Sequence, residues 1–255
     1  MMMKKVTVIT ASMAALLIST TANAEIKYAD NAVAVGARVE VSDASESSNQ
    51  YTRNTLELIH RSGYSWGELF AKYRIENFGE MSDKDKVKGT TNKFIGSLYH
   101  NINHSGSQVW FDLFTSANQA INENQITLGV AQKTKIAGIN IKFSVGAHAA
   151  MGHNAKNGLE QSGFTYNGIL TRINANYSIN KNIILFGVLN TSFDRDMHVQ
   201  KMFARDESTG MLAVAGAKYK FDKKLDMSVA YAHQQSWGGY NDNGDNINVA
   251  FSYHF

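Results

Sequence analysis

Apolar and polar residues alternate along most of this chain with a period of two. In the last nine residues, Ile, Val, Phe, Tyr and Phe occupy every second position, with Asn, Ala, Ser and His between them. Because successive side chains of a strand point to opposite faces, the pattern predicts β-strands with one apolar face. The twelve runs, of which 183–190 has no clean phase, lie at 32–41, 52–61, 68–77, 94–103, 108–115, 125–133, 139–151, 169–177, 183–190, 211–221, 225–233 and 247–255.

The connections between these runs alternate between short and long. Short links end some runs, and long polar links, such as 42–51, 79–93, 117–124, 152–163 and 194–209, end the others. An even number of strands with short turns on one rim and long loops on the other is typical of outer-membrane barrels, whereas a soluble sandwich has no reason to sort its loops. We predict an all-β transmembrane antiparallel barrel of about 12 strands, with short periplasmic turns and long extracellular loops. For 194–209 we favour a plain surface loop, and the alternative is a loop that folds inward as a constriction or lies over the mouth.

The N-terminus and the composition agree with an exported barrel. Residues 1–24 begin with two lysines, continue with an apolar run and end in an Ala-Asn-Ala cleavage site, so we expect a signal peptide at 1–24 and the barrel at 25–255. No later apolar stretch is long enough for a membrane helix. The chain has neither cysteine nor proline. The absence of proline agrees with a closed β-sheet, because proline has no backbone N–H to donate to a neighbouring strand.

The polar phase of the strands would line a channel. Twelve strands give a barrel about 24 Å across, between the filled eight-stranded barrel and the open sixteen-stranded porin. Wall charges set the selectivity of a pore, so the surplus of cations predicts a modest preference for anionic solutes. Alternatively, these charges pair across the lumen and only brace the wall. The predicted pore-lining cations are Arg38, Arg61, Lys72, Arg74, Lys133, Lys142, Arg172, Lys218 and Lys220, and the carboxylates are Glu40, Glu57, Glu68, Glu76, Asp112 and Asp226.

Catalytic and metal-binding groups are not evident in the sequence. A twelve-stranded outer-membrane phospholipase carries serine, histidine and asparagine on its outer wall, but neither His60 nor His100 has a neighbouring serine that resembles a nucleophile. His100 and His104 are about 13 Å apart along a strand, too far to share a metal ion. The stretch 241–245 lacks the glutamate of a calcium loop and favours a tight turn. We predict no catalytic residues, no metal site, no cofactor and no enzymatic activity.

The segment 37–74 resembles the opening of the oligogalacturonate-specific porin family, which also includes sialic-acid channels. The resemblance implies a small monomeric barrel with a basic lumen that passes acidic sugars or oligosaccharides. The nucleoside-specific channel family is the nearest rival, although its aromatic-rich track is not evident, since Phe70, Trp110 and Phe114 are the main large inward aromatics. The features that carry the resemblance are Arg38 and Glu40, then the pair His60-Arg61, the glycine-aromatic turn 63–67, and Glu68 and Lys72.

These observations predict an outer-membrane porin of a Gram-negative bacterium for passive diffusion of small hydrophilic solutes, with acidic sugars as the favoured class. The expected partners are outer-membrane lipid, the solutes and the barrel-assembly machinery, whose C-terminal signal the terminal aromatic strand resembles. The formal charge of +3 falls to +1 without the two signal-peptide lysines, so we expect no nucleic-acid partner. The alternatives are a structural or adhesive barrel with functional surface loops and a lipid-modifying outer-membrane enzyme.

Overall fold

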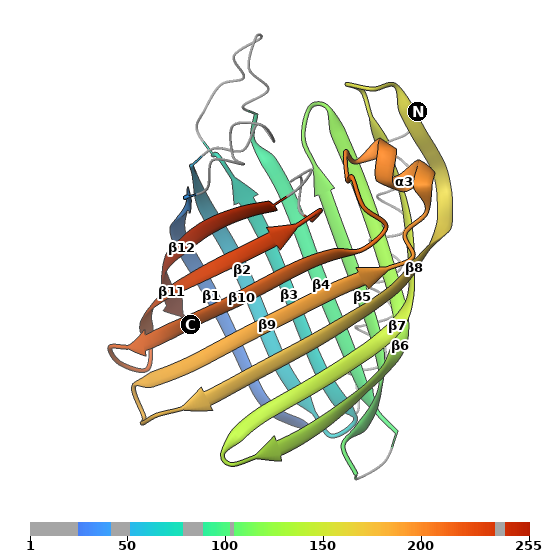
Figure 1. Ribbon diagram of the computed structural model, residues 1–255. Coiled ribbons are helices and arrows are strands. Elements are labelled where there is room, and N and C mark those ends of the chain that lie inside the picture. The colour runs from blue at the N-terminus through green and yellow to red at the C-terminus, as the bar shows by residue number, and fades with distance from the viewer. Residues whose placement is uncertain (1–24, 42–51, 79–88, 103–104, 238–242) are drawn as a thin grey trace.

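The computed structural model shows a closed antiparallel barrel of twelve strands (Figure 1). The structure describes residues 25–41, 52–78, 89–102, 105–237 and 243–255, so the predicted signal peptide lies outside the described residues. Each strand pairs with its neighbours in the sequence, and β1 pairs with β12 to close the sheet. The predicted fold class is therefore confirmed, together with all twelve of the predicted strands.

Most strands are longer than the alternating runs that predicted them, because pairing continues beyond the clean alternation; only β3 and β10 have the same length as their runs. Their bounds are β1 Ile26–Glu40, β2 Arg53–Tyr64, β3 Gly67–Glu76, β4 Thr91–Asn101, β5 Ser107–Ala117, β6 Ile121–Ile136, β7 Ile139–Asn154, β8 Leu159–Ser178, β9 Ile183–Phe193, β10 Gly210–Lys220, β11 Leu225–Gln235 and β12 Asn243–His254, with helix α3 Met197–Met202 between β9 and β10.

The terminal strand closes the barrel. Val35 of β1 lies opposite Phe251 of β12, and Ala32 lies opposite His254. The amide of Phe255 then donates to the carbonyl of Asn31 at 3.0 Å. The aromatic end of the chain is thus a paired strand whose alternate side chains point outward, which explains why the alternation continues to the last residue.

The contact between Arg172 on β8 and Asp112 on β5 identifies the inner face. Their side chains are 2.7 Å apart although the two strands are not adjacent in the sheet, so they meet inside the barrel. Residues opposite each other in register share a face. Following the register around the barrel from Asp112 returns to Arg172 on the same face, so the assignment is consistent for every strand.

The opposite face is apolar and outward. Leu58 and Leu128 are 51% and 62% exposed, which is the position of side chains that contact lipid in a membrane barrel. Among the described residues, no helix is both long enough and apolar enough to cross a membrane. Tyr177, Phe193 and Tyr219 also lie exposed near strand ends.

Two of the predicted long loops are wrong. Ile121 already begins β6, so the link after β5 is short, and β7 and β8 extend through most of 152–163 as a hairpin. The polar, glycine-containing sequence of this hairpin has no regular apolar alternation from which its pairing could be predicted. Register shifts on β7 between Ala147 and Ala149 and between Ala150 and Gly152 further break the alternation there.

Candidate functional site: the barrel lumen

The inner faces of β1 to β4 carry a dense ionic network, which we call the ionic wall. It follows from alternation on adjacent strands, because Glu57, Arg74 and Lys93 lie opposite one another across β2, β3 and β4. Five cations here meet three carboxylates. The cations are Arg38, Arg53, Lys72, Arg74 and Lys93, and the carboxylates are Glu40, Glu57 and Glu76.

Glu76 is the centre of the ionic wall. Its side chain is fully buried, and Lys93 Nζ donates to both carboxylate oxygens at 2.8 Å. Arg53 donates to one oxygen at 3.0 Å and Arg74 to the other at 3.4 Å. Three cations therefore share one carboxylate. Glu57 is shared in the same way by Arg74, in a short contact, and by Lys72 at 3.7 Å.

Two further contacts cross the lumen. Glu68 on β3 accepts from Lys142 on β7 at 2.5 Å and makes a short contact with Lys133 on β6. Arg172 on β8 makes a two-armed contact with Asp112 on β5, at 2.7 and 2.9 Å. These contacts join strands three or more positions apart in the sheet, so they narrow the channel between them.

The segment 194–209 folds onto the inner face of the barrel, and the prediction of a plain surface loop is wrong. Val199, Met202 and Phe203 are buried against Ala150, and the side-chain amide of Asn154 donates to the carbonyl of Met202 at 2.7 Å. The apolar residues of this segment are spaced so that α3 can bury one face against the wall. We call 194–209 the constriction loop.

Two arginines anchor the constriction loop. Arg205 makes a short ion pair with Glu123 on the inner face of β6. Arg195 donates to Ser192 Oγ and to the carbonyl of Ser236, each at 2.6 Å, and its guanidinium lies 5.3 Å from the centre of the Trp237 ring. Burial, and after it the charge of Arg205, lowers the pKa of Arg195 to about 9.

An aromatic cluster fills part of the lumen. Tyr99 and Trp110 stack with ring centres 6.4 Å apart, and Trp237 packs against the same cluster from the link after β11. Lys142 lies 3.6 Å above the Tyr99 ring and Arg172 lies 5.2 Å above the Trp110 ring. Trp110 is 0% exposed, so its face is covered by protein and is not open to a solute.

The inner faces of β9 to β12 have a different character, and we call them the neutral wall. On β9, which the structure describes in full, the inward residues are Ile184, Phe186, Val188, Asn190 and Ser192, with no charge among them. Charges appear only near the short turns, where Lys218 pairs with Asp226 at 2.8 Å. Figure 1 shows these strands in front of β1 to β4, across the lumen.

All nine predicted pore-lining cations lie on the inward phase. Eight of them pair with a carboxylate: Arg38 with Glu40, Arg61 with Asp30, Lys72 and Arg74 with Glu57, Lys133 and Lys142 with Glu68, Arg172 with Asp112, and Lys218 with Asp226. Lys220 is exposed near the periplasmic turn, and no ion pair to it occurs among the described residues. Their role in solute binding is still a prediction.

Several lumen residues were missed from the sequence. Arg53 and Lys93 lie at the edges of their alternating runs, and Glu123 and Arg205 lie in segments that were read as loops. Continuing the period of two by two residues at each end of a run would have found Lys93. Arg205 carries no such signal, because only the tertiary fold brings its loop to β6. Nowhere in the described part of the chain do three potential metal ligands gather.

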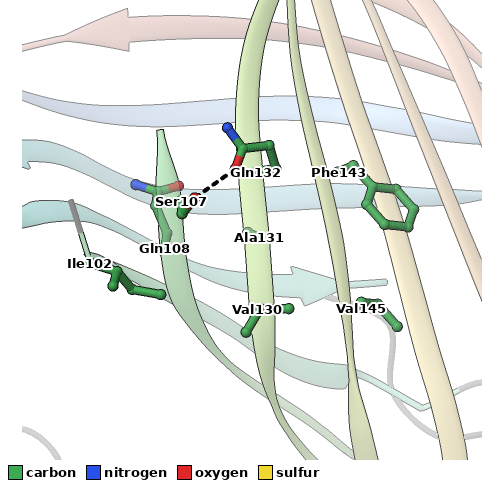
Figure 2. A pocket seen from close by; sticks show the side chains of 8 residues that line it. All are labelled: Ile102, Ser107, Gln108, Val130, Ala131, Gln132, Phe143 and Val145. Carbon is green, nitrogen blue, oxygen red and sulfur yellow. Dashed lines mark hydrogen bonds between the residues drawn. The ribbon is translucent and has the colours of Figure 1, made fainter. Parts of the chain in front are cut away.

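A shallow cavity of about 310 Å³ lies on the outer side of the wall (Figure 2). Val130, Phe143 and Val145 line it and point outward by register, and Ser107 donates to Gln132 at its edge at 2.8 Å. An apolar groove that faces lipid does not lie on a solute path. The lumen, with its charges, is therefore the candidate site.

The family described as nucleoside-specific channel-forming protein, Tsx, matches residues 27–254, which is nearly all of the barrel. This chain belongs to that family. It is an outer-membrane channel protein of a Gram-negative bacterium, and its family and structural relatives are channels and porins rather than enzymes. No curated protein sequence matches the chain.

Solved porin structures share its fold at low sequence identity. A KdgM porin solved in complex with disordered oligogalacturonate has a TM-score of 0.52 at 9% identity, covering 88% of this chain and 99% of that chain. A NanC porin has a TM-score of 0.51 at 11% identity, covering 88% and 98%. An outer-membrane channel from Pseudomonas putida F1 has a TM-score of 0.51 at 11% identity, covering 89% and 95%.

Proposed function

We propose that this Tsx-family channel conducts small hydrophilic solutes with a preference for those that carry a negative charge, such as acidic sugars. The observation that carries the proposal is the sharing of carboxylates. Five cations meet three carboxylates on the ionic wall, and Lys133 and Lys142 share Glu68. Pairing neutralises only part of the positive charge, so the remaining field favours anions.

The arrangement also suits a hydroxyl-rich solute. The ionic wall would bind the acidic group, while Asn248 and Ser228 of the opposite neutral wall, whose side chains are only partly buried, can exchange hydrogen bonds with sugar hydroxyls. We further propose that the barrel acts as a monomer that the barrel-assembly machinery inserts after removal of residues 1–24.

The test is the ion current of the purified, refolded protein in a planar bilayer under a salt gradient. We expect discrete steps and an anion-leaning reversal potential. Galacturonate should block the current more strongly than neutral galactose, because only galacturonate carries the carboxylate. A cation-leaning reversal potential, or equal block by the two sugars, would contradict the proposal.

A nucleoside is the second candidate solute, and the family match favours it. The stacked Tyr99 and Trp110 rings lie in the lumen, but Trp110 is covered, so stacking of a base on its face would require displacement of its neighbours. Uridine is the matched probe because it is hydroxyl-rich and uncharged. Block by uridine at lower concentration than galacturonate would favour the nucleoside.

A further inference from the structure

Outside the lumen, three polar side chains form a continuous hydrogen-bonded chain on β1 and β2. Nδ1 of His60 lies 2.9 Å from Oδ1 of Asn31, and Nε2 of the same ring lies 2.9 Å from Oγ of Ser62. In the sequence, no serine beside His60 resembles a nucleophile. The structure adds the contacts that the sequence does not show, because Asn31 comes from another strand and Ser62 lies two residues further on the same face of β2.

The hydrogen bonds favour one tautomer of the histidine. The Asn31 oxygen can only accept, so Nδ1 carries the proton and donates to it. Nε2 is then unprotonated and accepts the hydroxyl proton of Ser62. A serine whose hydroxyl donates to a histidine that a third residue orients is the arrangement of an activated nucleophile.

All three side chains point away from the lumen. Asn31 lies opposite His60 in register, and the inward face of the same strands carries Asp30 and Arg61. Ser62 lies two residues before the end of β2, about 7 Å along the strand from the short turn that marks the periplasmic rim. The strand ends of a membrane barrel lie near the interface between acyl chains and headgroups, where the ester groups of membrane lipids are found.

Other outward polar pairs lack this arrangement. Ser107 donates to Gln132, an amide that cannot take its proton, and His233 bonds to Asp245 at 2.9 Å without a serine. Polar groups on a lipid-facing wall are costly and in membrane proteins commonly mark function. Tyr231 also donates to Asp245, so its hydroxyl reaches His233 only through that carboxylate. Among the described outward residues, only in the Asn31–His60–Ser62 chain does a hydroxyl bond directly to an imidazole that another residue orients.

We propose that Ser62, His60 and Asn31 form a serine esterase site for ester-linked lipids of the leaflet at the periplasmic rim. Ser62 is the nucleophile, His60 the general base and acid, and Asn31 a positioning residue. The site is separate from the channel, because its side chains and the ion-paired lumen residues lie on opposite faces of the same strands.

The reaction has two balanced steps. Ser62 Oγ bonds to the ester carbonyl carbon as its proton passes to His60 Nε2; the ester C–O bond then breaks, and the leaving alcohol takes that proton. In the second step, water bonds to the acyl carbon and gives its proton to Nε2. Ser62 Oγ leaves and recovers the proton, which releases a fatty acid.

The proposal also depends on how a lipid ester reaches the Ser62 hydroxyl. Ser62 is 0% exposed, whereas His60 is half-buried. A lipid ester therefore reaches the hydroxyl only after the side chains around Ser62 rotate, and the proposal requires that lipid induces this rotation. Reactivity should accordingly be higher in vesicles than in detergent.

The experiment measures fatty acid released from a fluorescent diester phospholipid in vesicles that contain the whole refolded protein. A fluorophosphonate probe and mass spectrometry then identify the modified residue in the unaltered protein, so the test does not depend on any variant folding. We expect modification of Ser62, hydrolysis of the diester lipid, and no product from the diether analogue.

Variants separate catalysis from a structural role. Ser62→Ala and His60→Gln should each lower hydrolysis by about 100-fold or more, while the matched serine variant Ser107→Ala should leave it unchanged. Asn31→Ala should lower hydrolysis, and Asn31→Asp, which keeps an acceptor oxygen for Nδ1, should restore most of it. Conductance should be the same in all of these variants.

The proposal is overturned if Ser62 stays unmodified in vesicles and no fatty acid is released. It is equally overturned if release persists in Ser62→Ala, since a contaminating lipase would then be responsible. A loss of thermal stability in Ser62→Ala without hydrolysis by the unaltered protein would mean that the chain of hydrogen bonds only ties β1 to β2. None of these outcomes bears on the channel, whose current is measured separately.

Discussion

The ionic wall and the neutral wall are built from the same kind of strand, yet the side chains on their inner faces differ in charge. On β1 to β4, buried charges share partners, and Glu76 holds three cations at once. On β9 to β12, apolar, small and amide side chains face most of the lumen, and Asn248 donates to Asn246 at 2.8 Å. A wall without an extended ionic network therefore forms part of the same closed barrel. The network on β1 to β4 is thus better explained by function than by a requirement of folding.

The largest expected effect comes from Glu76→Gln. The change removes the charge that compensates three cations in a buried place, and breaking a buried ion pair typically costs about 3–5 kcal/mol. We expect the free energy of unfolding in detergent to fall by that order, measured by urea titration. Asn248→Ala on the neutral wall is the control and should cost about 1 kcal/mol. Equal losses at the two sites would remove the contrast between the walls.

The constriction loop tests whether the ionic wall alone sets ion preference. It lies against β7 and β8, between the two walls, and Arg205→Ala removes its ion pair with Glu123. We expect larger and noisier single-channel conductance because the loop loosens, with little change in the reversal potential. Lys201→Ala, an exposed change on the same helix, should leave the conductance unaltered. A large shift of the reversal potential in Arg205→Ala would mean that the loop also selects ions.

Single charges on the two walls should have smaller and opposite effects. A unit charge about 10 Å from an ion in water contributes about 0.4 kcal/mol, or roughly twofold in permeability ratio. Lys72→Gln should therefore lower the preference for anions by about that factor, and Ser228→Lys on the neutral wall should raise it. The reversal potential measures both. No response to either change would show that these walls do not face the conducting path.

The smallest expected effect concerns pH at a turn of the neutral wall. Backbone amides of Lys224 and Leu225 donate to Asp222 and lower its pKa. The turn gains this stabilisation above the unfolded pKa of about 3.9 and loses it as pH falls through the lower folded pKa. The NMR shift of the Leu225 amide should titrate with a midpoint below 3.9.

Asn180 provides the comparison for Asp222. Its side-chain oxygen accepts from the amides of Asn182 and Ile183, each at 2.9 Å, in the turn before β9, and it carries no titrating group. The Ile183 amide should not titrate in this range, and Asp222→Asn should abolish the titration at Leu225. A midpoint at or above 3.9 for Leu225 would contradict the hydrogen bonds found here.

Much of the barrel could be predicted from the sequence because its repeat is local. Alternation of single residues determines the face of each side chain, so all twelve strands and the inward phase of the nine cations follow from it. The inward phase of the run at 183–190 could not be predicted from alternation, for a physical reason. Its inward residues Ile184, Phe186 and Val188 are apolar like its outward ones, because this part of the wall carries no ions.

What only the tertiary structure decided is which residues from distant strands meet. Three features depend on contacts between distant segments that no sequence pattern predicts. They are the sharing of Glu68 by Lys133 and Lys142, the inward fold of the constriction loop, and the hydrogen bond between Asn31 and His60. Alternation determines the side of the wall on which a side chain lies, but barrel closure and strand register determine its depth and its neighbours. The sequence therefore determined a charged lumen, and the closed sheet decided which charges pair within it.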